Sequence, residues 1–237
     1  MIQTVDLIAK FRQALTENWG YIWGTAGDKW TQAKQTAIEK TTDADRAQAR
    51  KYGSKWIGHY VADCSGLFHW AFAKLGGYMY HGSDTMYRKY CESKGELKKG
   101  KRTDGKTLKT GTAVFVWNGT KYSHVGLFVG GGKVIEAAST QQGVITSNVT
   151  ASKWTNWGEL SGVSYSDKPD PGPEKGYAKV TGKKVALRQE PSTRATIITR
   201  IDTGETVKIE EEPKEWDYVS YKGKKGYMMR KFLQEGE

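Results

Sequence analysis

The stretch that most constrains the fold is DCSGLFHWAFAKL, residues 63–75. Its apolar side chains recur at the spacing of one helix face, at Leu67, Phe68, Ala71, Phe72 and Leu75. Asp63 and Ser65 are residue types that favour a helix start, which places Cys64 in the first turn. The positive end of a helix favours a nucleophilic thiolate, and the N–H groups of that turn suit an oxyanion. Cys64 is therefore a candidate nucleophile, and a buried apolar thiol is the structural alternative.

A second stretch, SHVGLFV at residues 123–129, predicts a strand that carries His124, the candidate base for such a thiol. The chain continues as VGGGKVIEAA at residues 129–138, where two apolar strands flank a glycine turn, the pattern of a β-hairpin. We expect the hairpin to bring Glu136 directly opposite His124, with Cβ atoms about 5 Å apart. A carboxylate there fixes the imidazole tautomer and raises its pKa. A core histidine and a solvated strand charge are the structural alternatives.

Together these stretches resemble the NlpC-type cell-wall cysteine endopeptidases, papain-like hydrolases that cut peptidoglycan stem peptides. The resemblance implies an α+β papain-like domain in which Cys64 attacks an amide and His124 acts as its base. It also implies a polar third member of the site on the strand after the histidine. The family most often has histidine there and this chain has Glu136. A carboxylate holds an imidazolium better than a second imidazole does, so the departure is physically reasonable.

The resemblance also implies a substrate site of hydroxyl and acidic side chains. The segment YIWG, residues 21–24, resembles the family's Tyr-x-x-Gly, whose tyrosine hydroxyl sits over the nucleophile; this assigns Tyr21 to the site. Asp63 and Ser65 occupy positions that line the pocket for the amino end of the substrate. Ser83 and Asp84 occupy positions that contribute to the substrate groove. Helix N-capping is the alternative for these four, and for Ser83 and Asp84 it is the preferred one.

Three other segments carry predictions. The spacing between Tyr21 and Cys64 is longer than the family's, so an insertion at about residues 25–60 is expected. A helix is predicted from Met86 to Cys91, which would make Cys91 an inert packed thiol. The segment KWTNWG, residues 153–158, resembles a tryptophan-rich closing segment of phage-type members, whose aromatics form core or groove wall.

The net charge of +11 predicts attraction to polyanions. Nucleic acid is disfavoured, because the basic residues are scattered apart from Lys98–Arg102. Bacterial walls with phosphate polymers are the preferred partner. No stretch approaches the roughly 18 apolar residues of a membrane span, so no membrane partner is expected. Residues 1–10 lack the features of a secretory signal, which predicts export by another route, as for a phage lysin, or a trimmed chain.

The histidines and cysteines predict neither a metal nor another cofactor. His59, His69 and His81 follow no ligand spacing, and no Cys-x-x-Cys pair exists. A disulfide between Cys64 and Cys91 is disfavoured, because it would silence the candidate nucleophile.

A proline-rich linker is predicted at residues 166–175, where three of the five prolines fall. Short strands between turns follow, at 177–180, 185–188, 197–201, 206–209, 216–221 and 226–229, which predicts an all-β barrel. Residues 176–237 resemble a bacterial SH3-like domain, notably in VALRQEPS at 185–192 and WDYV at 216–219. The resemblance implies tethering to the cell wall, and a structural spacer is the alternative.

The sequence therefore predicts an NlpC-type cysteine peptidase domain at residues 1–165 and an SH3-like wall-binding domain at 176–237. The predicted reaction is hydrolysis of a stem-peptide amide at the wall, by resemblance the D-glutamyl–diamino acid bond, by a monomer. Three alternatives stay open. They are an N-acetylmuramoyl-L-alanine amidase on the same fold, an acyltransferase, and a catalytically silent wall-binding protein.

Overall fold

The computed structural model describes residues 1–165, 177–209 and 215–235. The chain forms two compact units, Met1–Pro169 and Asp170–Glu237, which are described separately. The predicted linker at residues 166–175 lies outside the described residues.

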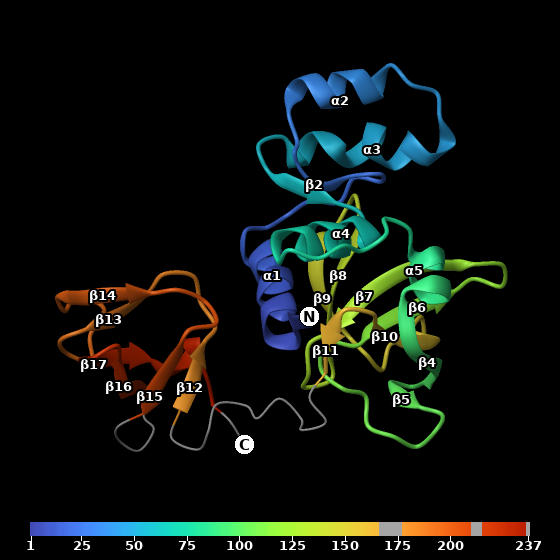
Figure 1. Cartoon of the computed structure of the whole chain (residues 1–237). Helices are drawn as coiled ribbons and strands as arrows, with labels where there is room; N and C mark the ends of the chain where they lie inside the picture. Colours follow the sequence, from blue (N-terminus) through green and yellow to red (C-terminus); the bar gives the residue numbers. More distant parts are fainter. Residues whose placement is uncertain (166–176, 210–214, 236–237) are drawn as a thin grey trace. The chain divides into compact units, whose positions relative to one another are not determined.

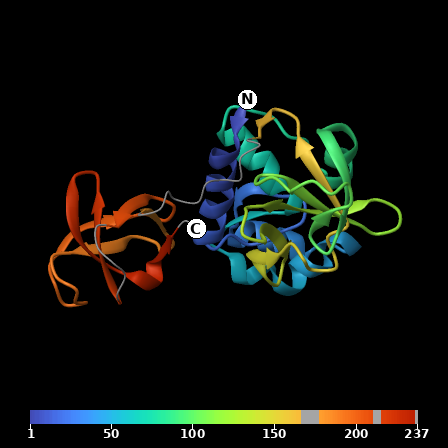
Figure 2. The ribbon, with the colours of Figure 1, turned by 90° about the horizontal axis from the view of Figure 1, so that it is seen from below.

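The first unit is built on an antiparallel sheet with the strand order β5-β4-β10-β6-β7-β8-β9 (Figure 1). Its strands are β4 (Cys91–Lys98), β5 (Lys101–Arg102), β6 (Ala113–Trp117), β7 (Tyr122–Phe128), β8 (Lys133–Ser139), β9 (Gly143–Asn148) and β10 (Asn156–Leu160). The helices that pack against it are α1 (Thr4–Thr16), α4 (Cys64–Lys74) and α5 (Ser83–Lys89). A short β1 (Ile2–Gln3) pairs in parallel with β11 (Val163–Ser164), which brings the N-terminus beside the end of this unit (Figure 2).

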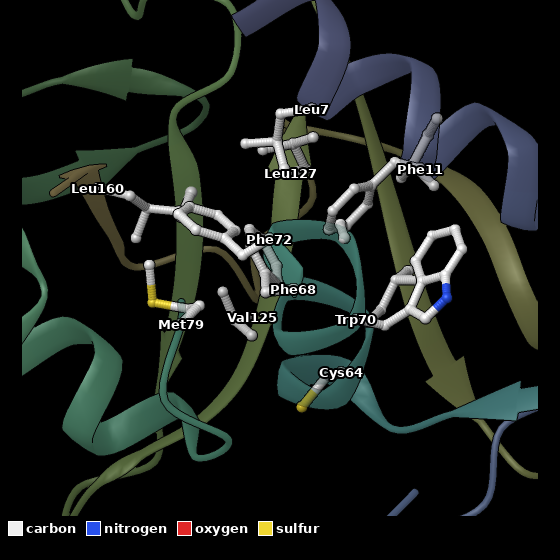
Figure 3. Close-up of a cluster of buried hydrophobic side chains, with 14 of the residues drawn as sticks. Leu7, Phe11, Cys64, Phe68, Trp70, Phe72, Met79, Val125, Leu127 and Leu160 are labelled. Atoms are coloured by element: carbon white, nitrogen blue, oxygen red, sulfur yellow. The ribbon is translucent and has the colours of Figure 1, made fainter. Parts of the chain in front are cut away.

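A hydrophobic cluster joins α1 and α4 to the sheet (Figure 3). Phe11 of α1 meets Phe68 of α4 edge to face, with ring centroids 4.6 Å apart. Alternate residues of β7, Val125 and Leu127, are fully buried against them, as the period of two in a strand requires. A second cluster, which includes Trp154 and Trp157, is built from other residues of the sheet and from the segment between β9 and β10. The predicted α+β class is confirmed.

The predicted insertion folds into a small helical layer with its own core. It contains β2 (Ala26–Lys29), α2 (Gln32–Glu39), α3 (Ala47–Tyr52) and the 3-10 turns η1 (Ala44–Arg46) and η2 (Gly53–Trp56), and β3 (Tyr60–Ala62) follows it. In Figure 1, α2 and α3 lie above β2, on the side of β2 away from α4. Ile22, Trp30, Ile38, Ala49, Trp56 and Val61 form the core of this layer. Strands β2 and β3 pair antiparallel, from Ala26 opposite Ala62 to Lys29 opposite Tyr60.

The predicted helix from Met86 to Cys91 is wrong at both ends. The helix α5 begins at Ser83 and ends at Lys89, and Cys91 opens strand β4, opposite Leu160 of β10. Pairing with β10 overrides the local helical pattern, and Gly158 leaves room for the Cys91 sulfur. Both cysteines are free, so the disulfide alternative is excluded. Burial raises the pKa of the Cys91 thiol to about 12, so at neutral pH it stays a protonated, packed thiol.

The second unit is an all-β barrel, as predicted. Its sheet has the order β14-β13-β17-β16-β15-β12-β18. The strands are β12 (Tyr177–Val180), β13 (Val185–Arg188), β14 (Ile197–Ile201), β15 (Thr206–Ile209), β16 (Trp216–Tyr221), β17 (Lys224–Met229) and β18 (Leu233–Glu235), with η3 (Arg230–Phe232) before the last. Val219 and Met228 point into the barrel core, so their neighbours along β16 and β17 point the other way. Tyr218 and Tyr227 are such neighbours, and their half-buried rings pack together across the two strands at 4.9 Å.

Candidate active site

The helix α4 begins at Cys64, and Asp63 is its N-cap, as its extended backbone and its side chain show. Asp63 Oδ1 accepts hydrogen bonds from the backbone N–H of Gly66 (2.7 Å) and from Ser65 Oγ (3.1 Å). The other oxygen, Oδ2, accepts the N–H of Gly24 (2.8 Å) and lies 2.8 Å from Nε2 of His81. The carboxylate therefore ties two other segments, at Gly24 and at His81, to the start of the helix that carries the candidate nucleophile.

Asp63 and His81 each favour the charged form of the other. Burial raises the pKa of Asp63, but the hydrogen bond and charge of His81 and the two backbone N–H groups outweigh it, so the pKa lies below its ordinary value. The hydrogen bond to Asp63 in turn raises the pKa of His81. Sequence reasoning missed His81, because only the fold places it against residue 63.

Tyr21 lies close enough to Cys64 and Asp63 for their charges to act on it. Burial raises the pKa of the Tyr21 hydroxyl, and the charges of Cys64 and Asp63 raise it further. The hydroxyl therefore keeps its proton at neutral pH and can donate a hydrogen bond. Figure 3 shows Cys64 at the first turn of α4, with its sulfur pointing away from the aromatic side chains of the cluster. The residue is 7% exposed.

Ser83 and Asp84 hold the strand that carries His124. Ser83 Oγ donates to the carbonyl oxygen of Tyr122 (2.7 Å), and the N–H of Tyr122 donates to Asp84 Oδ1 (3.0 Å). The N-cap of α5 is Gly82, so the capping interpretation of Ser83 and Asp84 is wrong. Their side chains fix the first residue of β7, two positions before His124.

Glu136 reaches His124 along a diagonal of the hairpin. The register pairs Leu127 with Ile135 and Phe128 with Val134, so its continuation puts Gly126, and not His124, opposite Glu136. The expectation of direct opposition is therefore wrong, and the offset is two residues along β7. A Cβ atom at Gly126 would lie 2.8 Å from Trp154 Cη2 and 3.2 Å from Glu136 Cβ. Glycine leaves the space through which His124 Nε2 donates to Glu136 Oε2 at 2.6 Å.

The imidazole of His124 lies between the thiol and the carboxylate. Burial lowers its pKa, but interactions with the Cys64 thiol and with Glu136 raise it more strongly, to about 9. Burial raises the pKa of Glu136, whereas hydrogen bonds from His124 and Lys153 lower it to about 2. At neutral pH the ring is therefore an imidazolium and Glu136 a carboxylate. Since Glu136 takes Nε2, the other ring nitrogen, Nδ1, is the one left for the thiol.

Two further residues complete the surroundings of His124. Trp154 stacks on its ring with centroids 5.7 Å apart and planes inclined by 21°. Lys153 Nζ lies 2.6 Å from each oxygen of Glu136. The tryptophan-rich motif predicted a packed aromatic here, and nothing in the sequence pairs Lys153 with Glu136.

Gly66 packs α4 closely against the backbone of Thr25. A Cβ atom there would overlap the backbone carbonyl oxygen of Thr25 and lie 3.0 Å from His81 Nε2. We expect Gly66→Ala to lower the free energy of unfolding by about 3 kcal/mol, because backbone cannot yield as a side chain does. Chemical denaturation measures this, and Lys74→Ala at the exposed end of α4 is the control. A loss below about 0.5 kcal/mol in Gly66→Ala would contradict the packing.

Among the described residues, no group of three His, Cys, Asp or Glu side chains is arranged to hold a metal ion. No helix in the described ranges is long and apolar enough to span a membrane.

Comparison with known proteins gives two family matches. Residues 47–160 match the model of the NlpC/P60 family, and residues 183–234 match that of the bacterial SH3 domain. The comparison with curated proteins gave no match.

Solved structures similar to this chain cover about two thirds of it. The NlpC/p60 domain of the peptidoglycan hydrolase SagA is 15% identical, with 66% of this chain and 98% of that chain covered and a TM-score of 0.42. The P60 domain of antigen MAP1204 from M. avium subspecies paratuberculosis is 19% identical, with 66% and 93% covered and a TM-score of 0.43. RipD from Mycobacterium tuberculosis, described as a non-catalytic NlpC/p60 domain protein, is 19% identical, with 67% and 98% covered and a TM-score of 0.42.

Proposed function

Because the chain contains an NlpC/P60-family domain followed by a bacterial SH3 domain, we propose that it hydrolyses an amide of the peptidoglycan stem peptide. One observation carries the proposal. The Cys64 thiol, at the start of α4, interacts with an imidazole whose other side is bound to a fully buried, ionised Glu136. This is the arrangement of nucleophile, base and orienting group that acyl transfer requires. Residues 1–165 form the catalytic domain in this proposal.

The proposed reaction begins with attack of the Cys64 thiolate on the amide carbon. Asp63 already uses the N–H groups of Gly66 and Leu67, so we assign the oxyanion to the N–H groups of Cys64 and Ser65. The imidazolium of His124 gives its proton to the leaving amine as the carbon–nitrogen bond breaks, which leaves a thioester. The neutral imidazole then takes a proton from water, whose oxygen attacks the thioester and releases the acid and the thiolate.

The proposed bond lies between D-glutamate and the diamino acid, as the family resemblance implies. The muramoyl–alanine amide is the second candidate. One similar structure, RipD, is described as non-catalytic, so activity itself must be tested. The presence of both Cys64 and His124, in contact, favours catalysis.

Digestion of purified muropeptides by the wild type and by Cys64→Ser, read by mass spectrometry, tests the proposal. New termini at D-glutamate and the diamino acid, made by the wild type alone, would support it. Release of intact stem peptides would identify an amidase. If neither the wild type nor Cys64→Ser gives a product, the protein binds the wall without cleaving it.

We propose that the second unit, residues 176–237, tethers the enzyme to the wall outside the cell. The net charge of +11 favours a polyanionic wall. Aromatic side chains on the outward face of β16 and β17, Trp216, Tyr218 and Tyr227, provide surface for a ligand, because they are half-buried and lie outside the barrel core. Tethering raises the effective concentration of substrate without changing the chemistry.

Residues 175–237 alone are expected to sediment with purified sacculi, because this unit has a core of its own. Quantification of bound and free protein after centrifugation measures the binding. Replacement of both Tyr218 and Tyr227 by alanine should weaken it at least about tenfold while leaving the inward-facing residues intact. Recovery of the isolated unit in the supernatant would contradict tethering.

A further inference from the structure

Lys153 lies at the solvent end of a series of interacting side chains that starts at Cys64. Its ammonium lies 2.6 Å from both oxygens of Glu136, and Glu136 lies 2.6 Å from His124, which interacts with Cys64. Glu136 is wholly buried, whereas the Lys153 side chain is 39% exposed. The carboxylate thus sits between two cations, one that takes part in the proposed reaction and one at the edge of the solvent.

Burial explains why a second cation is present. An ionised carboxylate without access to water is costly unless it is paired and hydrogen-bonded. With Lys153, Glu136 has charged partners for both oxygens and keeps one orientation. Lys153 also lies over the ring of its neighbour Trp154, at 4.6 Å from the centroid, and Trp154 stacks on His124. Two successive residues therefore hold the pair of His124 and Glu136, one by charge and one by ring contact.

The same cation limits how strongly Glu136 attracts the proton of His124. In the proposed reaction His124 must release this proton to the leaving amine and regain it from water. A lone buried carboxylate would hold the imidazolium more firmly and make it a weaker acid. The groups that the structure places against His124 and Glu136 are Cys64 from α4, Lys153 from the segment before β10 and the Ser147 side chain from β9.

We propose that Lys153 is a positioning residue, which holds Glu136 ionised and directed at His124 and offsets part of its charge so that His124 can exchange its proton. This inference rests on the proposed function for its link to turnover. The effect of Lys153 on the titration of His124 can be measured whether or not the protein has activity. A salt bridge that only stabilises the fold is the alternative, and it predicts lower stability with unchanged titration of His124.

Titration of the His124 imidazole by NMR, in the full chain, tests the proposal. In Lys153→Met the midpoint should rise by about one pH unit above its wild-type value, because the negative potential of Glu136 is no longer offset. Lys153→Arg keeps the charge and should restore most of the wild-type midpoint. Lys133→Met is the matched control, since it removes the same charge from an exposed lysine that binds Asn148 on the same sheet.

Activity provides a second measurement. The alkaline limb of the kcat/KM profile should move upward with the NMR midpoint, and kcat should fall about tenfold with KM within about twofold. Should Lys153→Met fail to fold, Lys153→Gln gives the same comparison with a side chain that still donates hydrogen bonds. A His124 midpoint equal to that of Lys133→Met overturns the inference. If no protein hydrolyses any muropeptide, the proposed function fails, and the NMR titration still decides the role of Lys153.

Discussion

Cys64→Ala is expected to lower kcat/KM for muropeptide hydrolysis by about 10⁴-fold or more, with binding to sacculi unchanged. The side chain removed is the proposed nucleophile, and substitution of one member of a catalytic set removes nearly all the rate that the set provides. No other thiol can substitute for it. The second cysteine, Cys91, is buried at the start of β4, and burial raises its pKa to about 12. Initial rates on purified muropeptides measure the effect.

The control for this prediction is Cys91→Ala, which removes a thiol of similar burial from the same domain. We expect its kcat/KM to stay within about twofold of the wild type, although its stability falls by about 1 kcal/mol through lost packing. Hydrolysis by Cys64→Ala at a tenth of the wild-type rate would rule out the thiolate mechanism.

Glu136→Gln is expected to lower kcat about 100-fold while the domain remains folded. A neutral amide keeps the shape of the side chain, but it removes the charge that holds the imidazolium of His124. The pKa of His124 should fall from about 9 toward its ordinary value. The alkaline limb of the pH–rate profile should therefore move to lower pH, opposite to the shift expected for Lys153→Met.

The dependence of stability on pH in the acid range provides a further check on Glu136. The pKa of its carboxyl in the folded protein is about 2, below the ordinary value of 4.5, so its ionised form contributes stability above pH 4.5 that is lost as pH falls toward 2. In Glu136→Gln this part of the acid-dependent loss of stability should disappear. Glu159→Gln, which removes a paired carboxylate elsewhere on the sheet, is the control. Unchanged turnover in Glu136→Gln would remove this residue from the site.

Local signals predicted the parts of the site that depend on local structure. A capping residue and one apolar face were enough to place Cys64 at a helix start, and two apolar runs on either side of three glycines predicted the hairpin of β7 and β8. Short runs of strand-forming residues between turn residues also predicted most strands of the second unit. In each case the residues that determine the element are neighbours along the chain.

The remaining features arise from contacts between distant segments. The offset between Glu136 and His124 depends on strand register, which a glycine turn of three residues does not specify. His81 meets Asp63, and Lys153 meets Glu136, only after the chain has folded, and neither pair lies at a helical or strand spacing. Cys91 belongs to a strand because β10 pairs with it, whatever its local preference.

The antiparallel pairing of β2 with β3 has a consequence for the long separation between Tyr21 and Cys64. The chain leaves the site after Gly24, whose N–H binds Asp63, and returns through Ala62, which lies opposite Ala26. The two ends of the segment between Ala26 and Ala62 therefore lie side by side. The pairing of β2 with β3 therefore holds Tyr21 and Cys64 at the two ends of one hairpin, while Lys55 and Trp56 fasten the intervening segment to the carbonyl oxygens of Gln141 and Thr140.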